Sequence, residues 1–539
     1  VAVGNYTLDA LTSGDENTAV GYQAGSSVTT ANQTVLIGRK AGFAVTEASN
    51  TVAIGNNAVA GCTTGTGNIG VGAATLENAD TETHNLAIGL TALNTVNGGG
   101  EYNVAVGNYT LDALTSGDYN TSLGYQAGSA LTTGDRNVII GSAAGDSLTT
   151  AGSNVIIGDE ACGGATMTGD YNVAIGRNSG FDMTSATKNT LVGFEAGKDL
   201  TTTQNSTLVG YKAGAVNTAH ECTAFGSESA LANTSGSGIL AIGREAYKTG
   251  DTEGHNMAIG LQTMDTGVNG GEYNIAVGNF ALKRITSGDG NTALGYNAGN
   301  DNTTGVENTF IGYEAGFNAT TGDGNTFVGG RAGYDANITG NENTGIGNFA
   351  LYRLTSGASN TVVGYDAATL ITSGGNNICI GMDAGVAASP SGSITTGSNT
   401  ICLGNNNISD FFCADTSISS SDKRDKTDIE NFNVGLEWIE KLQPVTYRWD
   451  RRTWYGDEEN PFGTPDGSKK RDRLHLGFLA QDVLEVEKSF GYAEKRDDML
   501  TVNLTEDGTS YGMKYERLVT VLVNAVKELS AEVKALKGE

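Results

Sequence analysis

The stretch Asn103-Val104-Ala105-Val106-Gly107 decides the fold, because its pattern returns as Asn120-Thr121-Ser122-Leu123-Gly124 and continues at a nearly constant spacing. The glycine of this pattern occurs 23 times between Gly4 and Gly381. Of the 22 steps, 17 are 17 residues long, four are 18 and one is 16. A period kept over so many copies indicates identical coils stacked along one axis, which is a solenoid.

Each unit reads as a short strand with two different faces. The residues one and three places before the repeat glycine are β-branched or apolar, as Val106 and Val104 are, whereas those two and four places before it are usually Ala and Asn. Side chains alternate between the faces of a strand. We expect both faces to be buried, one in the coil's own core and one against another chain. The stacked asparagines are expected to form a hydrogen-bonded ladder.

The repeat glycine is expected to turn the chain with a positive φ. A small apolar residue such as Ala127 follows it, and then a polar turn such as Leu114–Asp118. Aromatic side chains directly after the glycine suit either stacking on sugars or a ladder that stabilises the coils, and their recurrence in register favours the ladder. They are Tyr22, Tyr125, Phe194, Tyr211, Tyr296, Tyr313 and Tyr365.

Composition separates the repeats from the rest of the chain. All four prolines and all three tryptophans lie beyond Gly381, which places a boundary near residue 400. The net charge is −28, and residues 1–404 hold 13 Lys and Arg against 34 Asp and Glu. This acidity argues against nucleic acid and anionic membrane as partners. The sequence contains no run of 18 apolar residues, so it predicts no membrane-spanning helix. The chain opens in mid-repeat at Val1, so we expect an attachment region upstream.

The six cysteines are scattered and form no C-x-x-C pair, so buried free thiols are the expectation, with folding in a reducing cytoplasm. They are Cys62, Cys162, Cys222, Cys379, Cys402 and Cys413. We expect neither a metal nor a cofactor.

The repeat, with Asn-x-Ala-x-Gly at its centre, resembles the head repeats of trimeric autotransporter adhesins and similar coils in bacteriophage tail fibres. The resemblance covers residues 1–404 and implies a trimeric β-roll or β-helix.

Beyond Gly404 the period is lost, and three blocks resemble the C-terminal intramolecular chaperone, auto-processing family of phage tailspikes and fibres. The blocks are Ser421–Lys426 with Asp428-Ile429, then Gly435–Tyr447, and then Gly477–Val483 followed by Tyr515–Leu529. The resemblance implies that residues 422–539 form a small α+β domain that drives trimer assembly of the fibre and then cuts itself off. Residues 405–421 are then a tip or linker that ends at the cut.

The same resemblance assigns Ser421 as nucleophile and Lys426 as base, with Asp422 and Arg424 in support. The cut bond adjoins Ser421, and the sequence leaves open on which side. A serine hydroxyl needs a base, and a lysine serves where burial or nearby positive charge lowers its pKa. Taken alone, this hexapeptide is typical of a solvated linker, and the later blocks favour auto-processing. One turnover per chain suffices, and no multiple-turnover enzyme is expected in the shaft.

The chain ends in a heptad pattern that predicts a short parallel coiled coil, with a helix packed in the chaperone core as the alternative. The two seam positions are Val519, Val526 and Val533, and Leu522, Leu529 and Leu536. Val and Leu at these positions often favour dimers, so the seam does not by itself fix three copies.

These patterns favour the distal part of a phage tail fibre or spike, a homotrimer in the virion that is assembled in the host cytoplasm. The expected partners are a host-surface receptor, with a glycan favoured, and upstream tail or baseplate proteins. Phe411 and Phe412 are candidates for an exposed receptor tip. The alternatives are a tailspike that degrades polysaccharide, which needs a carboxylate pair in a groove, and a bacterial trimeric surface adhesin. A 17-residue period offers many wrong registers of nearly equal energy, which a C-terminal clamp that trimerises first would resolve.

Overall fold

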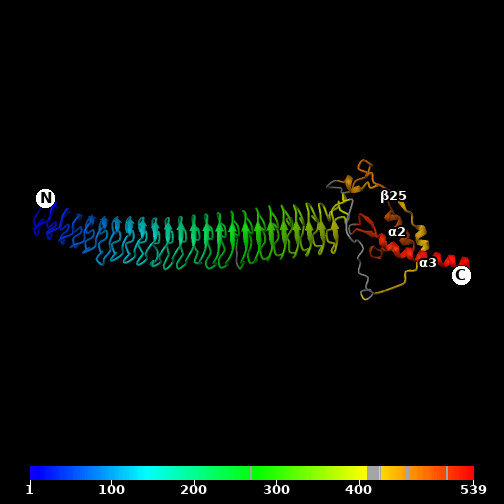
Figure 1. Cartoon of the computed structure of the whole chain (residues 1–539), viewed down its shortest axis with the longest axis horizontal. Coiled ribbons are helices and arrows are strands. Elements are labelled where there is room, and N and C mark those ends of the chain that lie inside the picture. The colour runs from blue at the N-terminus through cyan, green and yellow to red at the C-terminus, as the bar shows by residue number, and fades with distance from the viewer. Residues whose placement is uncertain (267–269, 409–423, 425, 457–461, 506–507, 539) are drawn as a thin grey trace. The chain divides into compact units, whose positions relative to one another are not determined.

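The computed structural model describes every residue except 267–269, 409–423, 425, 457–461, 506–507 and 539. The chain divides into two compact units, Val1–Thr321 and Gly322–Glu539. Both contain coils of about 17 residues with one short strand each, and the second also contains a small region of helices and hairpins (Figure 1). The expected mostly β solenoid followed by a small α+β region is therefore confirmed for the single chain. The predicted boundaries at residues 404 and 421 stay predictions.

The strands of the first unit are β1 (Ala2–Val3), β2 (Thr18–Val20), β3 (Val35–Ile37), β4 (Val52–Ile54), β5 (Ile69–Val71), β6 (Leu86–Ile88), β7 (Val104–Val106), β8 (Thr121–Leu123), β9 (Val138–Ile140), β10 (Val155–Ile157), β11 (Val173–Ile175), β12 (Thr190–Val192), β13 (Thr207–Val209), β14 (Thr223–Phe225), β15 (Leu240–Ile242), β16 (Met257–Ile259), β17 (Ile275–Val277), β18 (Thr292–Leu294) and β19 (Thr309–Ile311).

The solenoid strands of the second unit are β20 (Thr326–Val328), β21 (Thr344–Ile346), β22 (Thr361–Val363), β23 (Ile378–Ile380) and β24 (Ile401–Leu403). After them come α1 (Leu436–Lys441), β25 (Val445–Tyr447), β26 (His475–Gly477), α2 (Ala480–Ser489), β27 (Val502–Leu504), β28 (Tyr511–Met513) and α3 (Leu518–Lys537). The 3₁₀ turns are η2 (Arg452–Tyr455), η3 (Arg496–Asp498) and η4 (Tyr515–Arg517).

Within each unit, strands of successive coils pair in parallel with the repeat in register. β7 and β8, for example, align Ala105 with Ser122. The middle residue of a strand points into its own coil, and both of these side chains are fully buried. The rest of the core comes from the turns, where Leu111 and Leu114 are also fully buried. The small face of the strand is thus the one that fills the coil.

The predicted asparagine ladder is present inside the coils. The side-chain oxygen of Asn103 accepts hydrogen bonds from the backbone N–H and the amide of Asn120, at 2.9 and 3.1 Å. The Asn120 amide also donates to the carbonyl of Gly134 at 2.9 Å, and its oxygen accepts from Asn137 in turn. Each buried asparagine side chain forms hydrogen bonds with the coil after it. Because a buried amide that lacks these bonds would be destabilising, the ladder holds neighbouring coils together.

A second ladder, which the sequence analysis did not anticipate, runs through the polar turns. The Thr115 hydroxyl donates to the carbonyl of Thr132 at 3.0 Å, and the Thr132 hydroxyl donates to Thr149 at the same distance. The first threonines of the Leu-Thr-Thr and Leu-Thr-Ser turns therefore extend the interactions between coils beyond the strand.

The repeat glycine has the predicted positive φ, 141° at Gly124. The next coil also requires glycine at this position, because a Cβ at Gly124 would lie 2.2 Å from the carbonyl oxygen of Gly141. Any other residue would both strain the backbone and push successive coils apart.

Aromatic stacking occurs where adjacent coils both carry a ring. Phe194 and Tyr211 stack with centroids 5.5 Å apart, as do Tyr296 and Tyr313. A further column five residues before the repeat glycine stacks His84 on Tyr102 at 5.1 Å. The predicted stabilising ladder is therefore formed by those rings that have a neighbour.

Replacing Asn120 by Ala is expected to lower the free energy of unfolding by about 1–3 kcal/mol for each buried group that loses its partner. These groups are the Asn137 donors and the Gly134 carbonyl. Denaturant unfolding of the full chain measures the effect. The matched control is Asn56→Ala at an exposed position, and an equal loss in both variants would contradict the ladder's role.

The five described cysteines are buried and unpaired, as expected, and Cys413 lies outside the described residues. Burial raises the pKa of the Cys62 thiol to about 11 and that of Cys162 to about 12. These thiols are expected to resist alkylation at pH 8 in the folded chain and to react after denaturation.

Because the folded pKa values are raised, the stability that these thiols contribute is complete below the unfolded value of about 8.5. It falls as the pH rises towards the folded values. Mass spectrometry of the alkylated chain counts the modified residues. Labelling of native Cys162 at the rate of a free thiol would refute its burial.

Candidate assembly surface and self-cleavage segment

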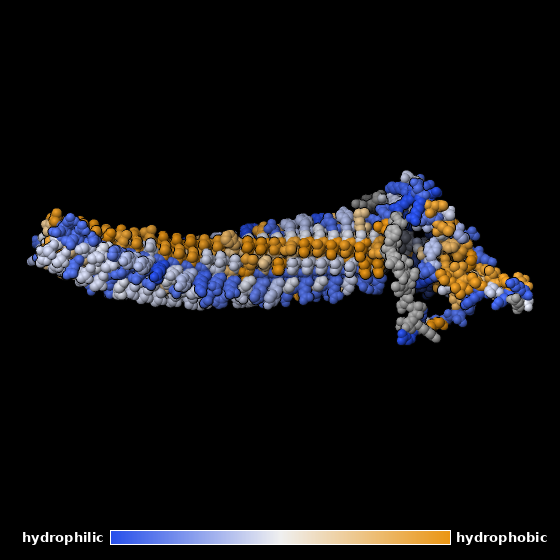
Figure 2. All heavy atoms as spheres, viewed as in Figure 1, coloured by the Kyte–Doolittle hydropathy of each residue, from blue (hydrophilic) through white to orange (hydrophobic). Residues whose placement is uncertain are grey.

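The aliphatic face of the strands points outward and has no cover in the single chain. The residue before the repeat glycine is partly exposed along the coils, with 37% exposure at Ile37, 47% at Leu123 and 55% at Phe225. In Figure 2 these side chains form an apolar stripe over the stacked strands. In the second unit the same position is filled by Ile346, Ile380 and Leu403, all exposed.

An apolar stripe of this kind is unusual on a monomer, since contiguous exposed apolar patches larger than a few hundred Å² mark interaction surfaces. The sequence predicted that both strand faces would be buried, one of them against another chain. The structure shows that the Asn and Ala face fills the coil and that the aliphatic face is uncovered in the single chain.

The C-terminal region of the second unit has its own small core. Trp438 of α1 is fully buried and stacks on Phe490 with centroids 5.1 Å apart. Val483 of α2, Val502 of β27 and Val521 of α3 pack into the same cluster. This core gathers residues from all three helices, so the later sequence blocks converge on one folded body.

Two motif glycines allow those blocks to meet. A Cβ at Gly435 would lie 2.4 Å from the backbone nitrogen of Ala525 in α3. A Cβ at Gly477 would lie 2.5 Å from the Tyr515 hydroxyl, which accepts a hydrogen bond from the Phe478 backbone N–H at 3.1 Å. The second block thus lies directly against the terminal helix, and the third block against the turn that precedes it.

A buried carboxylate that the sequence analysis missed ties α2 to the hairpin of β27 and β28. Glu487 is fully buried, and it accepts hydrogen bonds from the backbone N–H groups of Leu500, Thr501 and Val502 at 2.5 to 3.0 Å. The Thr501 hydroxyl donates to it as well. The signal was an acidic residue four places after Val483, on the apolar face of the helix.

Helix α3 uses two faces. Leu518, Val521 and Ala525 are buried against the small core, and Glu528 accepts a hydrogen bond from the Leu436 backbone N–H at 2.5 Å. The predicted heptad seam lies on the exposed remainder of the helix. Its members are Val519, Leu522, Val526, Leu529, Val533 and Leu536, all at least 41% exposed. The helix therefore packs in the core of the C-terminal region and still leaves its seam open.

The self-cleavage block is the least defined of the predicted sites. Ser421 and Asp422 lie outside the described residues, as do Phe411 and Phe412 of the predicted tip. Arg424 and Lys426 are exposed. The pairing of the proposed nucleophile with its base therefore stays a prediction. A lysine base needs surroundings that disfavour its ammonium form.

In the described part of the chain, no group of three or more His, Cys, Asp or Glu side chains is arranged to hold a metal ion. Nor does any described helix have the length and apolarity needed to cross a bilayer.

Comparison with known families agrees with the position of the first two blocks and of Gly477–Val483, whereas Tyr515–Leu529 lies outside the matched residues. Residues 421–492 match the family described as chaperone of endosialidase. The match begins at Ser421 and runs through α1, β25, β26 and α2, and it supports a C-terminal chaperone domain. It covers less than half of the chain. No curated protein and no solved structure matches the chain.

Proposed function

We propose that this chain is the distal part of a phage tail fibre or tailspike, a homotrimer whose C-terminal domain guides its assembly and then cleaves itself at Ser421. The observation that carries the proposal is the match to an endosialidase chaperone directly after a solenoid with a bare apolar stripe. The mature solenoid would act in host adhesion on the virion, with a surface glycan as the favoured receptor.

The stripe supports assembly from like copies because the same apolar position recurs in successive coils, so identical chains can align coil with coil. Each Val, Leu or Ile that passes from half-exposed to buried contributes on the order of 1 kcal/mol. Summed over the coils, this gain greatly exceeds the marginal stability of an ordinary domain. Three copies follow from the family resemblance, and a dimer is the outcome that the heptad seam alone would also permit.

Helix α3 supports an order of events. Its seam is open while its other face is fixed in the chaperone core, so the C-terminal domains can associate before any coil forms. Association at one end holds the three chains together and raises the effective concentration of their coils. It also shortens the search for non-local β-pairing, which is otherwise slow.

The cleavage step needs only residues of the first block. The Ser421 oxygen adds to the carbonyl carbon of an adjoining peptide bond as Lys426 takes its proton. The C–N bond breaks, the proton passes to the leaving nitrogen, and water hydrolyses the ester to restore the hydroxyl. Because Lys426 is exposed in the single chain, we place the burial that activates it in the assembled trimer, so that cleavage follows assembly.

Placing a charge in the stripe should weaken the pairing of the coils. With Leu123→Lys, each trimer would bury three ammonium groups at a cost of several kcal/mol each. Light scattering should still find three chains, because the α3 seam is unchanged, but the protease resistance of the solenoid is expected to fall. Thr133→Lys in an exposed polar turn is the matched control and should keep the resistance of the wild type. A wild-type chain that is monomeric with its coils folded would contradict the proposal.

Replacing the proposed nucleophile or base should stop cleavage. The wild type is expected to give a large fragment ending beside Ser421 and a small C-terminal one, whereas Ser421→Ala and Lys426→Ala stay intact on a gel. Mass spectrometry of the fragments decides which side of Ser421 is cut. Ser420→Ala is the matched control and should cleave normally. If Ser421→Ala cleaved as fast as the wild type, the assigned nucleophile would be wrong.

A further inference from the structure

The last complete coil is longer than all the others. The step from Gly381 to Gly404 is 23 residues, while every earlier step is 16 to 18. β23 and β24 nevertheless pair in register, Cys379 opposite Cys402. Aligned with the coil that ends at Gly141, Ile394 takes the core position of Leu131, and both side chains are buried. The six additional residues are therefore 388–393, and they lie in the turn without disturbing the strands.

This insertion lies where the C-terminal region meets the coils within the second unit. Ser389 and Pro390 form one wall of a cavity of about 450 Å³ whose other wall includes Arg452, Phe462 and Tyr511. On another side, Pro390, Ser391 and Ser393 line a cavity of about 370 Å³ together with Arg496 and Leu504. The two strands of the C-terminal hairpin, β27 and β28, thus each line a cavity together with residues of the insertion.

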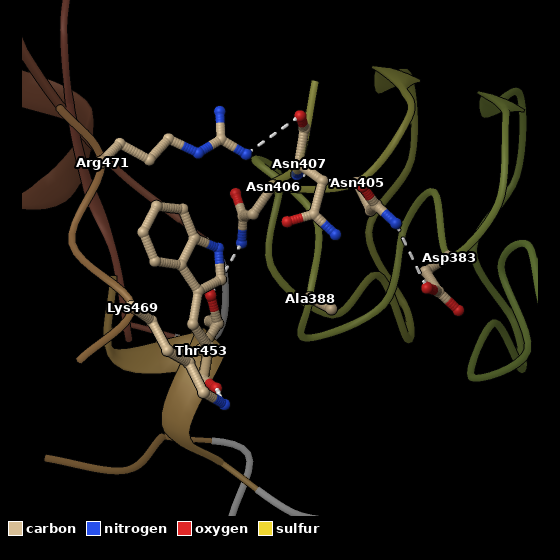
Figure 3. A pocket seen from close by; sticks show the side chains of 9 residues that line it. Asp383, Ala388, Asn405, Asn406, Asn407, Thr453, Lys469 and Arg471 are labelled. Carbon is tan, nitrogen blue, oxygen red and sulfur yellow. Dashed lines mark hydrogen bonds between the residues drawn. The ribbon is translucent and has the colours of Figure 1, made fainter. Parts of the chain in front are cut away.

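The insertion also positions the chain segment that the C-terminal region binds most directly. The Ala388 carbonyl accepts a hydrogen bond from the Asn406 backbone N–H at 2.7 Å. The side chain of Asn406 donates to the Thr453 hydroxyl at 3.4 Å and accepts from Arg451. Arg471 donates to the carbonyl of Asn407 at 3.3 Å, and Figure 3 shows this contact beside the one to Thr453.

Both arginines are held in place by tryptophans of the same region. The Arg451 guanidinium lies 4.3 Å from the ring centroid of Trp449, and that of Arg471 lies 5.0 Å from that of Trp454. Two planar cations stacked on indoles are pre-organised donors, so less freedom is lost when they bind the asparagine segment. The arginine pair is therefore a pre-organised binding surface for the segment that contains Asn406 and Asn407.

We propose that the insertion 388–393 is the site at which the C-terminal region docks on its own chain. The regular coils are nearly equivalent, so a docking element that recognised their common features would have many competing positions. The insertion occurs in one coil alone. Docking there makes the coil from Gly381 to Gly404 the first to form in every copy, which gives all three chains the same starting register. This inference rests on the proposed chaperone function.

Two variants of the whole chain test this docking site. Deleting residues 388–393 restores a 17-residue step and keeps the apolar core residues, Ile394 among them. Arg451→Gln with Arg471→Gln leaves the coil untouched and removes the docking donors. In both, the yield of protease-resistant solenoid is expected to fall about tenfold or more, because the arginine variant loses charge-assisted hydrogen bonds and the deletion loses the Ala388 carbonyl that positions their acceptor Asn406. Light scattering should still find three chains, because the α3 seam is unchanged.

The matched control deletes residues 125–141, a whole regular coil, and should keep wild-type resistance. A 388–393 deletion that remains as resistant as the wild type, or a control that loses as much as the test variants, would overturn the inference while leaving the trimer and the chaperone intact. If the deletion variant is insoluble, the arginine pair decides on the same criteria. A monomeric wild type would instead overturn the proposed function.

Discussion

The structure depends on the requirement that each buried amide be satisfied by the coil beside it. Asn103, Asn120 and Asn137 each accept two hydrogen bonds from the next coil and donate to it. Such a group has no adequate partner within its own coil, so a single coil is costly and a stack is stable. The repeat glycine enforces the same rule sterically, since its Cα faces the carbonyl of the next coil. Cooperation between neighbours thus replaces the large apolar core of a globular domain.

This internal arrangement explains the exterior. The amides, the small residues of the strand and the leucines of the turns fill the coil, so the aliphatic side chains on the other face of the strand form the outward stripe. The polar groups bind coil to coil within one chain, and the apolar side chains on the outer face of the strand are left uncovered in the single chain. The terminal helix repeats this division on a smaller scale, with one face in the chaperone core and the heptad seam outside.

Much of this was predictable because the repeat supplies many copies of one pattern. Strand position, the asparagine ladder and the turning glycine follow from period-2 alternation and the nearly constant spacing, and the structure confirms them. Which face of the strand is internal was not predictable, because Val104 and Ala105 both suit a buried site. Glu487 and the arginines at the last coil were missed because each acts once, through contacts distant in sequence. The residues of the cleavage block can be assigned only by resemblance, since Ser421 lies outside the described part and Lys426 is exposed.

The stacking of His84 on Tyr102 at 5.1 Å is matched by His255 on Tyr273 at 5.2 Å, ten coils later. The segments around these two pairs, 84–121 and 255–292, are closely similar and lie 171 residues apart. Because a coil interacts only with its immediate neighbours, a block of whole coils can be copied within a gene and inserted elsewhere without redesigning any contact. The reach of such a protein can therefore be altered by unequal recombination, while its ends and their specificities are inherited unchanged.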